Sequence, residues 1–499
     1  MEKQAEAKQI SLEEVFTPRG IAVVGASVHS LEGGISFGGL VVLSLIQAGF
    51  PAVYPINPKY SDILSIPCFP NLLAVPGVVD HVVVNIPAEA CLKLLDECAV
   101  KGVRSVHFFT AGFGESGYKD RAAIEQAMLN KARAGGFRII GPNCTGIFIP
   151  RHRVTNSIGI PLDPGSVAFI SQSGGHAQNL PKFSGPRGIR FSKVVSYGNA
   201  LDVNECELLD YFAQDNETEI IAAYIEGVRN GTGFAQSLAK AAVCKPVIVY
   251  KGGKTEAGIR AALGHTASMM SNISVFEALC RQTNTIQVDN LDDMIDILTA
   301  LRFALPLPSG TGTAMIGAGG GPAVLGSDEL EGAGLHVPRL SQHIQDELKR
   351  ILPIDGSIFT NPVDTLNLID PRAINVALRI VGSSPNIHML VYHLGFHPIS
   401  SWGLGRFSTS SFLESAIAVI RGARDAIGKP VLIALRPPED LEGMKEFLAT
   451  QNAFVAAELP VFHSLRGLAG AMSRVVNWQC RQNRRAVSVH LANQAETSE

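Results

Sequence analysis

Val247-Ile248-Val249-Tyr250 precedes Gly252-Gly253-Lys254-Thr255-Glu256-Ala257-Gly258-Ile259-Arg260-Ala261-Ala262-Leu263-Gly264-His265-Thr266-Ala267-Ser268. The first run is short, apolar and rich in β-branched residues, which predicts a buried strand. The second run reads as a flexible loop that leads into a helix beginning near 273. Loops at the carboxyl ends of parallel strands are where open α/β sheets bind ligands. This segment therefore predicts a ligand-binding strand end with one candidate nucleophile, His265.

Composition and charge limit the class of protein. The 499 residues suffice for about three domains of ordinary size. Hydrophobic residues make up 46% and charged residues 17%, which favours sheets covered on both faces or surfaces buried against a partner. The net charge of −3 gives no electrostatic case for binding nucleic acid, and no apolar run is long enough to span a bilayer. The charged start does not resemble a secretory signal, and eight scattered cysteines without a CxxC pair predict a reduced, cytoplasmic protein without a metal site.

Residues 1–148 alternate apolar runs with helix-like segments, which predicts a doubly wound parallel sheet. Each apolar run ends in small or polar residues. Because parallel strands end at one edge of a sheet, these residues are expected to line one crevice suited to a nucleotide-like ligand. The candidates are Gly25, Ala26, Ser27, Asn57, Lys59, Pro87, Thr110, Ala111, Gly112 and Asn143.

An NAD site is the obvious alternative for this crevice, but the spacing disfavours it. The residues after Gly25 do not follow GxGxxG, and the acidic ribose ligand expected about 20 residues later is missing. Lys59 instead follows the second strand, and a lysine there suits a phosphorylated ribose, as in coenzyme A or NADP. A solvated surface lysine is the competing interpretation of Lys59.

The region 149–305 predicts an anion site. An apolar run at 167–170 is followed by Ser171-Gln172-Ser173-Gly174-Gly175 and the start of a helix. Such a turn directs backbone N–H groups, hydroxyl groups and the positive end of the helix towards an anion, although a simple helix cap by Ser171 or Ser173 is the alternative. Glu226 and the segment with His265 follow strands of the same predicted sheet, so they are expected to converge on this turn.

A third α/β unit follows a proline-rich linker at 305–310. Its strands are expected at 314–316, 389–392 and 431–435. The turn Gly319-Gly320-Gly321-Pro322 lacks the lysine of a P-loop and reads as a tight strand-to-helix connection. From about Asn477 the sequence predicts a short helix and then a disordered end.

Several motifs together resemble the NDP-forming acyl-CoA synthetases, the group that contains succinyl-CoA synthetase and ADP-forming acetate–CoA ligase. The motifs of the first region are similar to the CoA-binding domain of that group, and those of the second to its phosphohistidine domain. They are Gly25-Ala26-Ser27, Asn57-Pro58-Lys59, Thr110-Ala111-Gly112-Phe113, Gly141-Pro142-Asn143, Phe191-Ser192-Lys193, Gly198-Asn199, Asp202-Val203, Tyr224-Ile225-Glu226-Gly227 and Gly258 through Thr266.

The resemblance covers about 12–475 and implies an α/β fold of three doubly wound domains. These are a Rossmann-like CoA-binding domain at 1–148, a flavodoxin-like domain with the phosphohistidine loop at 149–305, and a second flavodoxin-like domain at 306–475, before a tail at 476–499. The third domain carries Asn361-Pro362-Val363-Asp364 as a further matching motif.

The resemblance also implies roles for individual residues. In the group, the histidine at the position of His265 takes up a phosphoryl group, and the glutamate at the position of Glu226 orients it. A neutral imidazole is a competent nucleophile near pH 7, and a carboxylate on its other nitrogen fixes the tautomer. The implied ligands of this chain are coenzyme A and phosphate. The phosphate-binding residues would be Ser171, Ser173, Gly174 and Gly175.

This sequence departs from the group's pattern around the histidine. The common form is Ser-His-Thr-Gly-Ser with small residues after it, whereas Gly264 precedes the histidine here and Ala267, Met269 and Met270 follow it. These changes either reshape the acyl pocket or weaken catalysis. His176 replaces a small or apolar residue of the group, and we interpret it as structural or close to the substrate.

Nothing in the sequence resembles the ATP-grasp domains that complete the reaction in the group. The resemblance therefore implies an α-type subunit of a hetero- or homo-oligomer, with ATP, ADP and Mg²⁺ bound only through a separate ATP-grasp β-type partner. Its small-molecule substrate would be a carboxylic acid or acyl-CoA. Two alternatives stay open: a CoA- or acyl-CoA-binding protein without ligase activity, and a nucleotide-independent, phosphate-dependent acyl transferase.

Overall fold

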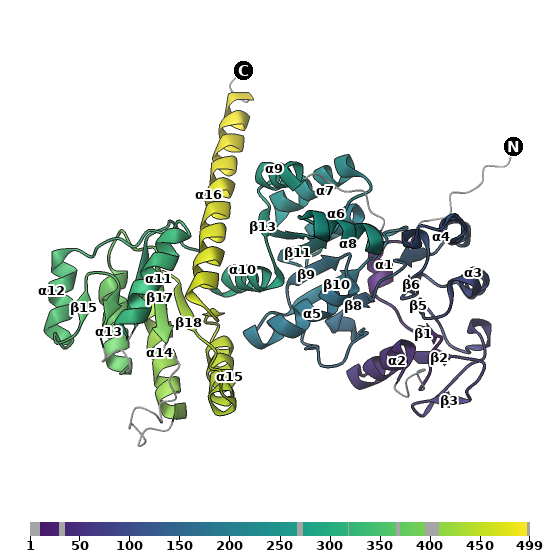
Figure 1. The fold of residues 1–499 in the computed structure, drawn as a ribbon, viewed down its shortest axis with the longest axis horizontal. Helices are drawn as coiled ribbons and strands as arrows, with labels where there is room; N and C mark the ends of the chain where they lie inside the picture. Colours follow the sequence, from purple (N-terminus) through teal and green to yellow (C-terminus); the bar gives the residue numbers. More distant parts are fainter. Residues whose placement is uncertain are drawn as a thin grey trace. The chain divides into compact units, whose positions relative to one another are not determined.

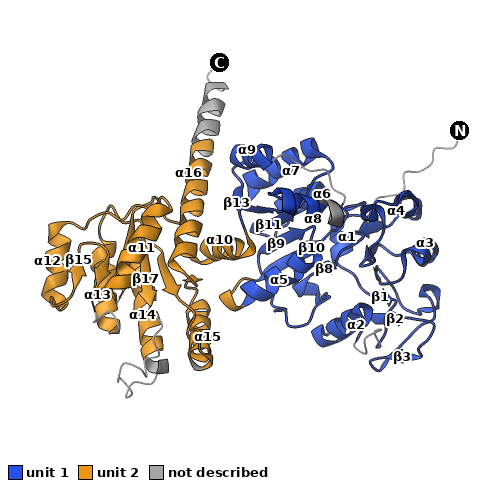
Figure 2. Ribbon diagram, viewed as in Figure 1, with its two compact units in different colours: residues 1–185, 190–289 blue, residues 186–189, 290–499 orange. Residues whose placement is uncertain are grey.

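The computed structural model describes residues 10–28, 35–266, 273–317, 319–365, 370–394 and 409–496, and Figure 1 shows their helices and strands. The chain divides into two compact units (Figure 2). Unit 1 comprises residues 1–185 and 190–289, and unit 2 comprises residues 186–189 and 290–499. In the part of the chain that the structure describes, no helix is both long and apolar enough to cross a membrane.

The first sheet of unit 1 is parallel and has the strand order β2-β1-β5-β6-β7. The alternation of strands and helices along residues 1–148 predicted this doubly wound arrangement, and the structure confirms it. Its strands are β1 (Ile21–Val24), β2 (Val53–Ile56), β5 (His81–Val84), β6 (Ser105–Phe108) and β7 (Arg138–Ile140). The helices around it are α1 (Leu12–Phe16), α2 (Phe37–Ala48), α3 (Ala88–Lys101) and α4 (Lys119–Gly135), with the small hairpin β3 (Asp62–Ile63) and β4 (Ile66–Pro67).

The second sheet of unit 1 has the order β13-β12-β11-β9-β10-β8. Its strands are β8 (Gly146–Phe148), β9 (Val167–Ser171), β10 (Phe191–Ser196), β11 (Ile220–Ile225), β12 (Val247–Lys251) and β13 (Ile286–Val288). All neighbours are parallel except β8, which pairs antiparallel with β10 and was not predicted. Its helices are α5 (Gly174–Ser184), α6 (Glu205–Gln214), α7 (Gly231–Cys244), α8 (Glu256–Thr266) and α9 (Ile273–Thr283).

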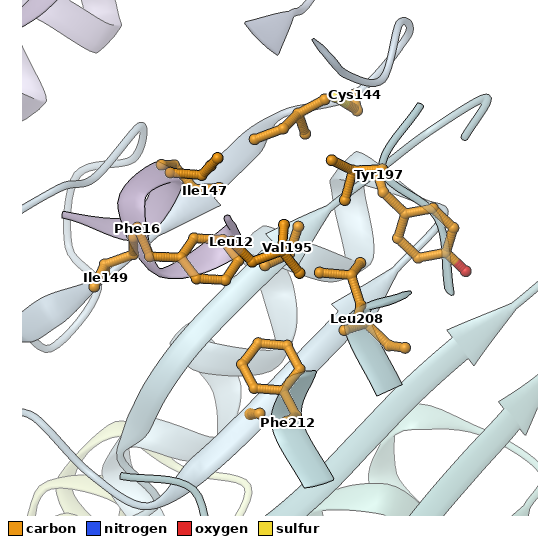
Figure 3. Close-up of a cluster of buried hydrophobic side chains, with 14 of the residues drawn as sticks. Leu12, Phe16, Cys144, Ile147, Ile149, Val195, Tyr197, Leu208 and Phe212 are labelled. Carbon is orange, nitrogen blue, oxygen red and sulfur yellow. The ribbon is translucent and has the colours of Figure 1, made fainter. Parts of the chain in front are cut away.

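One hydrophobic core joins the two sheets of unit 1. Buried residues of the first sheet, such as Val23 and Ile140, belong to the same cluster as Val195 and Phe212 of the second. The short helix α1 contributes to it: the ring of Phe16 stacks on that of Phe212 with the centroids 6.2 Å apart, and Figure 3 shows this part of the cluster. Burying one such large apolar side chain stabilises the fold by roughly 1.5–3 kcal/mol. The shared core explains why the two sheets form one compact unit.

Unit 2 contains the third sheet, in the order β15-β16-β14-β17-β18-β19. Its strands are β14 (Thr313–Gly317), β15 (Ile358–Phe359), β16 (Val363–Asp364), β17 (Met389–Leu394), β18 (Val431–Leu435) and β19 (Val461–Phe462). Its helices are α10 (Leu291–Phe303), α11 (Gly320–Gly332), α12 (Gln342–Ile351), α13 (Pro371–Gly382), α14 (Thr409–Ile427), α15 (Leu441–Ala456) and α16 (Leu465–Glu496). The helix α16 continues without a break where the sequence predicted a short helix and then a disordered end, because no glycine or proline interrupts it after Gly470.

Candidate active site

A cavity of about 560 Å³ lies in unit 1, at the carboxyl ends of strands from both sheets. Its wall is formed by the turns after β5, β6 and β7 together with the N-terminus of α5. The lining residues are Asn85, Ile86, Pro87, Phe109, Thr110, Ala111, Asn143, Cys144, Thr145, Ser173, Gly174 and Gly175. The volume is within the range of small-molecule and cofactor sites. The cavity therefore brings a predicted CoA crevice and a predicted anion site together.

Seven of these lining residues are among the candidates predicted from the sequence. They are Pro87, Thr110, Ala111, Asn143, Ser173, Gly174 and Gly175. The individual candidate residues predicted from the sequence did not include Asn85, Ile86, Phe109, Cys144 and Thr145. Cys144 is 3% exposed, and burial raises the pKa of its thiol well above the usual value. All five missed residues flank named ones, so extending each strand end by one or two residues would have found them.

Close backbone approaches shape the crevice of the first sheet. Gly25 adopts φ +85°, and a Cβ there would lie 2.1 Å from the carbonyl oxygen of Asn85. The hydroxyl group of Thr110 donates to the carbonyl oxygen of Ile86 over 2.7 Å, and the N–H of Asn143 donates to that of Thr110 over 3.0 Å. Three strand ends are thus tied directly to one another, and only glycine fits at position 25.

The other predicted CoA residues lie outside the cavity lining: Gly25, Ala26, Ser27, Asn57, Lys59 and Gly112. Most of them gather at the ends of β1 and β2. The Asn57 side chain donates to the carbonyl oxygen of Ala26 over 2.8 Å and accepts the N–H of Lys59 over 3.0 Å. The hydroxyl group of Ser27 lies 3.1 Å from that of Tyr60. The hydrogen bond to Asn57 fixes the backbone at Lys59, whose side chain is exposed.

The turn before α5 is the predicted anion site. Ser173 is the N-cap and accepts the N–H of His176 over 3.4 Å, so the predicted alternative of a helix cap applies to it. The hydroxyl group of Ser171 is buried and donates to the carbonyl oxygen of Ser173 over 2.7 Å, outside the cavity lining. The N–H groups of the first helical turn have no partner within the helix. Ser173, Gly174 and Gly175 are the residues of this turn that line the cavity.

Glu226 follows β11 on the same edge of the second sheet as this turn. Tyr224, two residues before Glu226, pairs in register with Ser171 of β9. Glu226 is buried, with 9% of its surface exposed, and the hydroxyl group of Tyr224 hydrogen-bonds to its side chain. Burial and the nearby Glu226 both raise the pKa of Tyr224. Glu226 does not line the cavity, but the structure places it one strand away from the anion turn.

His176 lies beside this glutamate. Its imidazole ring packs edge-on against the ring of Tyr224, with the centroids 4.4 Å apart and an interplanar angle of 76°. Burial lowers the pKa of His176, while Glu226 acts to raise it. The Nδ1 atom is buried without a hydrogen-bond partner among the described residues. The imidazole therefore adjoins the predicted phosphoryl site while belonging to the helix that begins there.

The segment after β12 is helical where a flexible loop was predicted. The helix α8 begins at Glu256 and ends at Thr266. The Thr255 hydroxyl group accepts the N–H of Gly258 over 3.1 Å, and strong helix formers such as Glu, Ala, Arg and Leu follow, so local propensity outweighs the two glycines. The backbone of His265 lies in α8. Its side chain, and the residues Ala267, Met269 and Met270, lie outside the described part of the chain.

Two family models match unit 1 and part of α10. The CoA binding domain matches residues 19–150, and the succinyl-CoA ligase-like flavodoxin domain matches residues 164–301. These matches agree with the Rossmann-like and flavodoxin-like sheets described above.

Among curated proteins, the chain is 32% identical over 450 residues to the α subunit of ADP-forming acetate–CoA ligase II of Pyrococcus furiosus, which covers 90% of this chain and 95% of that subunit. It is 34% identical over 365 residues to ADP-forming acetate–CoA ligase II of Archaeoglobus fulgidus, but spans only 53% of that protein. Among solved structures, it is similar to dinucleotide-forming acetyl-coenzyme A synthetase 1 of Ca. Korarchaeum cryptofilum in complex with phosphate and ADP. That likeness has a TM-score of 0.78 at 27% identity and covers 96% of this chain and 99% of the other.

Proposed function

The chain belongs to the NDP-forming acyl-CoA synthetases, the family of the ADP-forming acid–CoA ligases, and from this premise we propose that it acts as the α-type subunit of such a ligase. The observation that carries the proposal is one cavity shared by the strand ends of the first sheet and the N-terminus of α5. A thioester and a phosphate must meet in one site for this chemistry, and the cavity adjoins both predicted binding elements.

In the proposed first step, an oxygen of inorganic phosphate attacks the thioester carbonyl carbon of acyl-CoA. The C–S bond breaks, so acyl phosphate forms and the CoA thiol is released. The N–H groups at Gly174 and Gly175 hold the phosphate, assisted by the positive end of α5. The strand ends of the first sheet hold coenzyme A, and Lys59 pairs with its ribose phosphate.

In the proposed second step, an imidazole nitrogen of His265 attacks phosphorus, and the carboxylate leaves. Glu226 accepts a hydrogen bond from the other ring nitrogen and stabilises the phosphorylated ring. The phosphoryl group then passes to ADP on an ATP-grasp β-type partner, which also holds Mg²⁺. In the reverse direction the complex makes acyl-CoA from a carboxylic acid, CoA and ATP. The name "subunit alpha" of two relatives supports a partner chain, and the phosphate and ADP of the K. cryptofilum structure support the proposed ligands.

The test combines the purified chain with a candidate ATP-grasp subunit, ATP, CoA and a panel of carboxylic acids. Formation of acyl-CoA and ADP that requires both subunits and His265 supports the proposal. CoA binding without any acyl-CoA formation favours the binding-protein alternative. Acyl phosphate formed without a nucleotide-binding subunit and without phosphohistidine favours the acyl transferase.

A further inference from the structure

Two buried polar side chains hold the main chain at Glu226, one from each neighbouring strand. Gln172 lies in the anion turn between Ser171 and Ser173, and Lys251 is the last residue of β12. Their exposed fractions are 3% and 1%. Neither residue lines the cavity, so neither is placed to contact a ligand there. The register explains their position, since β9 and β12 flank β11 and Ile225 pairs with Lys251.

The side chain of Gln172 forms hydrogen bonds with the main chain of Glu226 and Gly227. Its amide oxygen accepts the N–H groups of Glu226 and Gly227, the latter over 3.0 Å. Its amide nitrogen donates to the carbonyl oxygen of Gly227 over 2.9 Å. A side-chain amide that uses both ends on one segment fixes both the position and the orientation of that segment. Glu226 therefore cannot shift relative to the anion turn without breaking three hydrogen bonds.

Lys251 holds the same segment from the opposite strand. Its Nζ atom donates to the carbonyl oxygen of Glu226 over 2.6 Å and to that of Gly252 over 2.5 Å. Gly252 is the first residue after β12, and its N–H donates to the carbonyl oxygen of Ile225 over 2.9 Å. Lys251 thus links Glu226 to the beginning of the segment that leads into α8 and His265.

A contribution to fold stability is a poor explanation for a lysine that is buried at position 251. Removing an ammonium group from water is costly, and buried ionic groups are often replaced by apolar ones of similar volume without loss of stability. Burial lowers the pKa of Lys251, while Glu226 acts to raise it. Both hydrogen bonds that Lys251 donates end on main-chain carbonyl groups, one at Glu226 and one at the start of the segment that leads into α8, which points to a role in geometry.

We propose, resting on the function proposed above, that Gln172 and Lys251 are positioning residues for phosphoryl transfer. They fix Glu226 relative to the anion turn on one side and to the His265 segment on the other. The anion turn, Glu226 and the segment that leads into α8 are thereby held in one register.

The test measures histidine phosphorylation in the single chain. The chain is incubated with radiolabelled inorganic phosphate and a panel of acetyl-, isobutyryl- and phenylacetyl-CoA, and acid-labile, base-stable label is followed over time. The variants Gln172→Met and Lys251→Met, which keep side-chain volume, are expected to label roughly 10- to 100-fold more slowly, the scale of a misplacement near 1 Å. CoA affinity, measured by calorimetry, is expected to stay unchanged because neither residue lines the cavity.

Lys245→Met is the matched control. Lys245 also donates to two main-chain carbonyl oxygens, those of Phe212 and Asp215, but it precedes β12 at the opposite end of the strand. Its variant is expected to label at the wild-type rate. Lys251→Gln, which can still donate a hydrogen bond, is expected to label at an intermediate rate and serves if Lys251→Met does not fold.

A double variant separates positioning from structural support. If Lys251 acts through the Glu226 carboxylate, adding Lys251→Met to Glu226→Ala causes no further fall in rate. Wild-type rates in the single variants, or a second full loss in the double variant, would overturn this inference alone. A wild-type chain that takes up no label would overturn the proposed function and this inference with it.

Discussion

Asn199 donates a hydrogen bond of 2.6 Å to Glu115 and so joins the turn after β10 in the second sheet to the loop after β6 in the first. The same carboxylate accepts the N–H groups of Gly112 over 2.6 Å and Phe113 over 3.2 Å. The loop that continues from Thr110 and Ala111, one wall of the cavity, is thereby fixed against the second sheet.

Removing this carboxylate should loosen that wall. Glu115→Ala leaves three donors without their acceptor. Hydrogen bonds to charged groups contribute about 1.5–3 kcal/mol each to the free energy of unfolding. We expect a lower unfolding temperature and weaker CoA binding in calorimetry. The exposed Glu219 provides the control, since Glu219→Ala removes the same charge from the chain without touching the cavity. Equal CoA affinity in both variants would show that the loop holds its shape without Glu115.

Gly25→Ala should damage the crevice more than an ordinary glycine substitution. The new Cβ would lie 2.1 Å from the carbonyl oxygen of Asn85, so β1 and β5 must separate at their ends. Gly102, the C-cap of α3, has φ +72° with open space around it, so Gly102→Ala incurs only the left-handed backbone strain of about 1–2 kcal/mol. Thermal unfolding and CoA titration of the two variants check this. Similar losses in both would mean that the close approach to Asn85 is unimportant.

Two buried histidines should make the fold sensitive to acid. His81 and His107 lie with ring centroids 6.2 Å apart, and burial lowers their pKa values to about 3 and about 4. In the unfolded chain both histidines take up a proton near pH 6.5, whereas in the folded chain they stay neutral until the pH falls to about 4 and about 3. The stability that the two neutral rings contribute is therefore complete above pH 6.5 and is lost as the pH falls towards 4 and 3. Urea unfolding at pH 7.5, 6 and 5 should show up to about 2.7 kcal/mol lost per pH unit from this pair. A flat profile below pH 6.5 would contradict the assignment of neutral, buried rings.

The imidazole of His176 should report on Glu226. Burial lowers the pKa of His176, and the negative charge of Glu226 opposes that effect. In an NMR titration of imidazole-labelled protein, Glu226→Gln should therefore lower the pKa of His176 further. A pKa that rises or stays constant in the variant would show that Glu226 is not charged beside His176.

The parallel sheets and their order along the chain could be predicted, because short apolar runs between helical segments have few other solutions. The helix α3 (Ala88–Lys101) carries an apolar period and a glycine directly after its last residue, the pattern that predicts a helix and its end. The strand β8 could not be predicted, since three residues beside a glycine-rich turn carry too little pattern, and its partner β10 lies over 40 residues away.

The candidate site was predictable in its parts and less so in its assembly. Strand ends such as Thr110, Asn143 and Ser173 carry a recognisable signal of their own. Gln172 and Lys251 do not, because a polar residue at a strand end reveals its buried hydrogen bonds only when neighbouring strands are in register. The helical state of 256–266 was missed because its glycines were weighed above its helix formers. The roles of the site residues and the domain boundaries at 148, 305 and 475 stay predictions.

The most direct test of the central claim is phosphorylation of His265. The purified chain is incubated with γ-labelled ATP and a candidate ATP-grasp subunit, beside His265→Ala and the exposed control His152→Ala. We expect an acid-labile, base-stable label that requires the partner, persists in His152→Ala and disappears in His265→Ala. Label that persists in His265→Ala, or CoA binding without label under any condition, would contradict the proposed phosphohistidine.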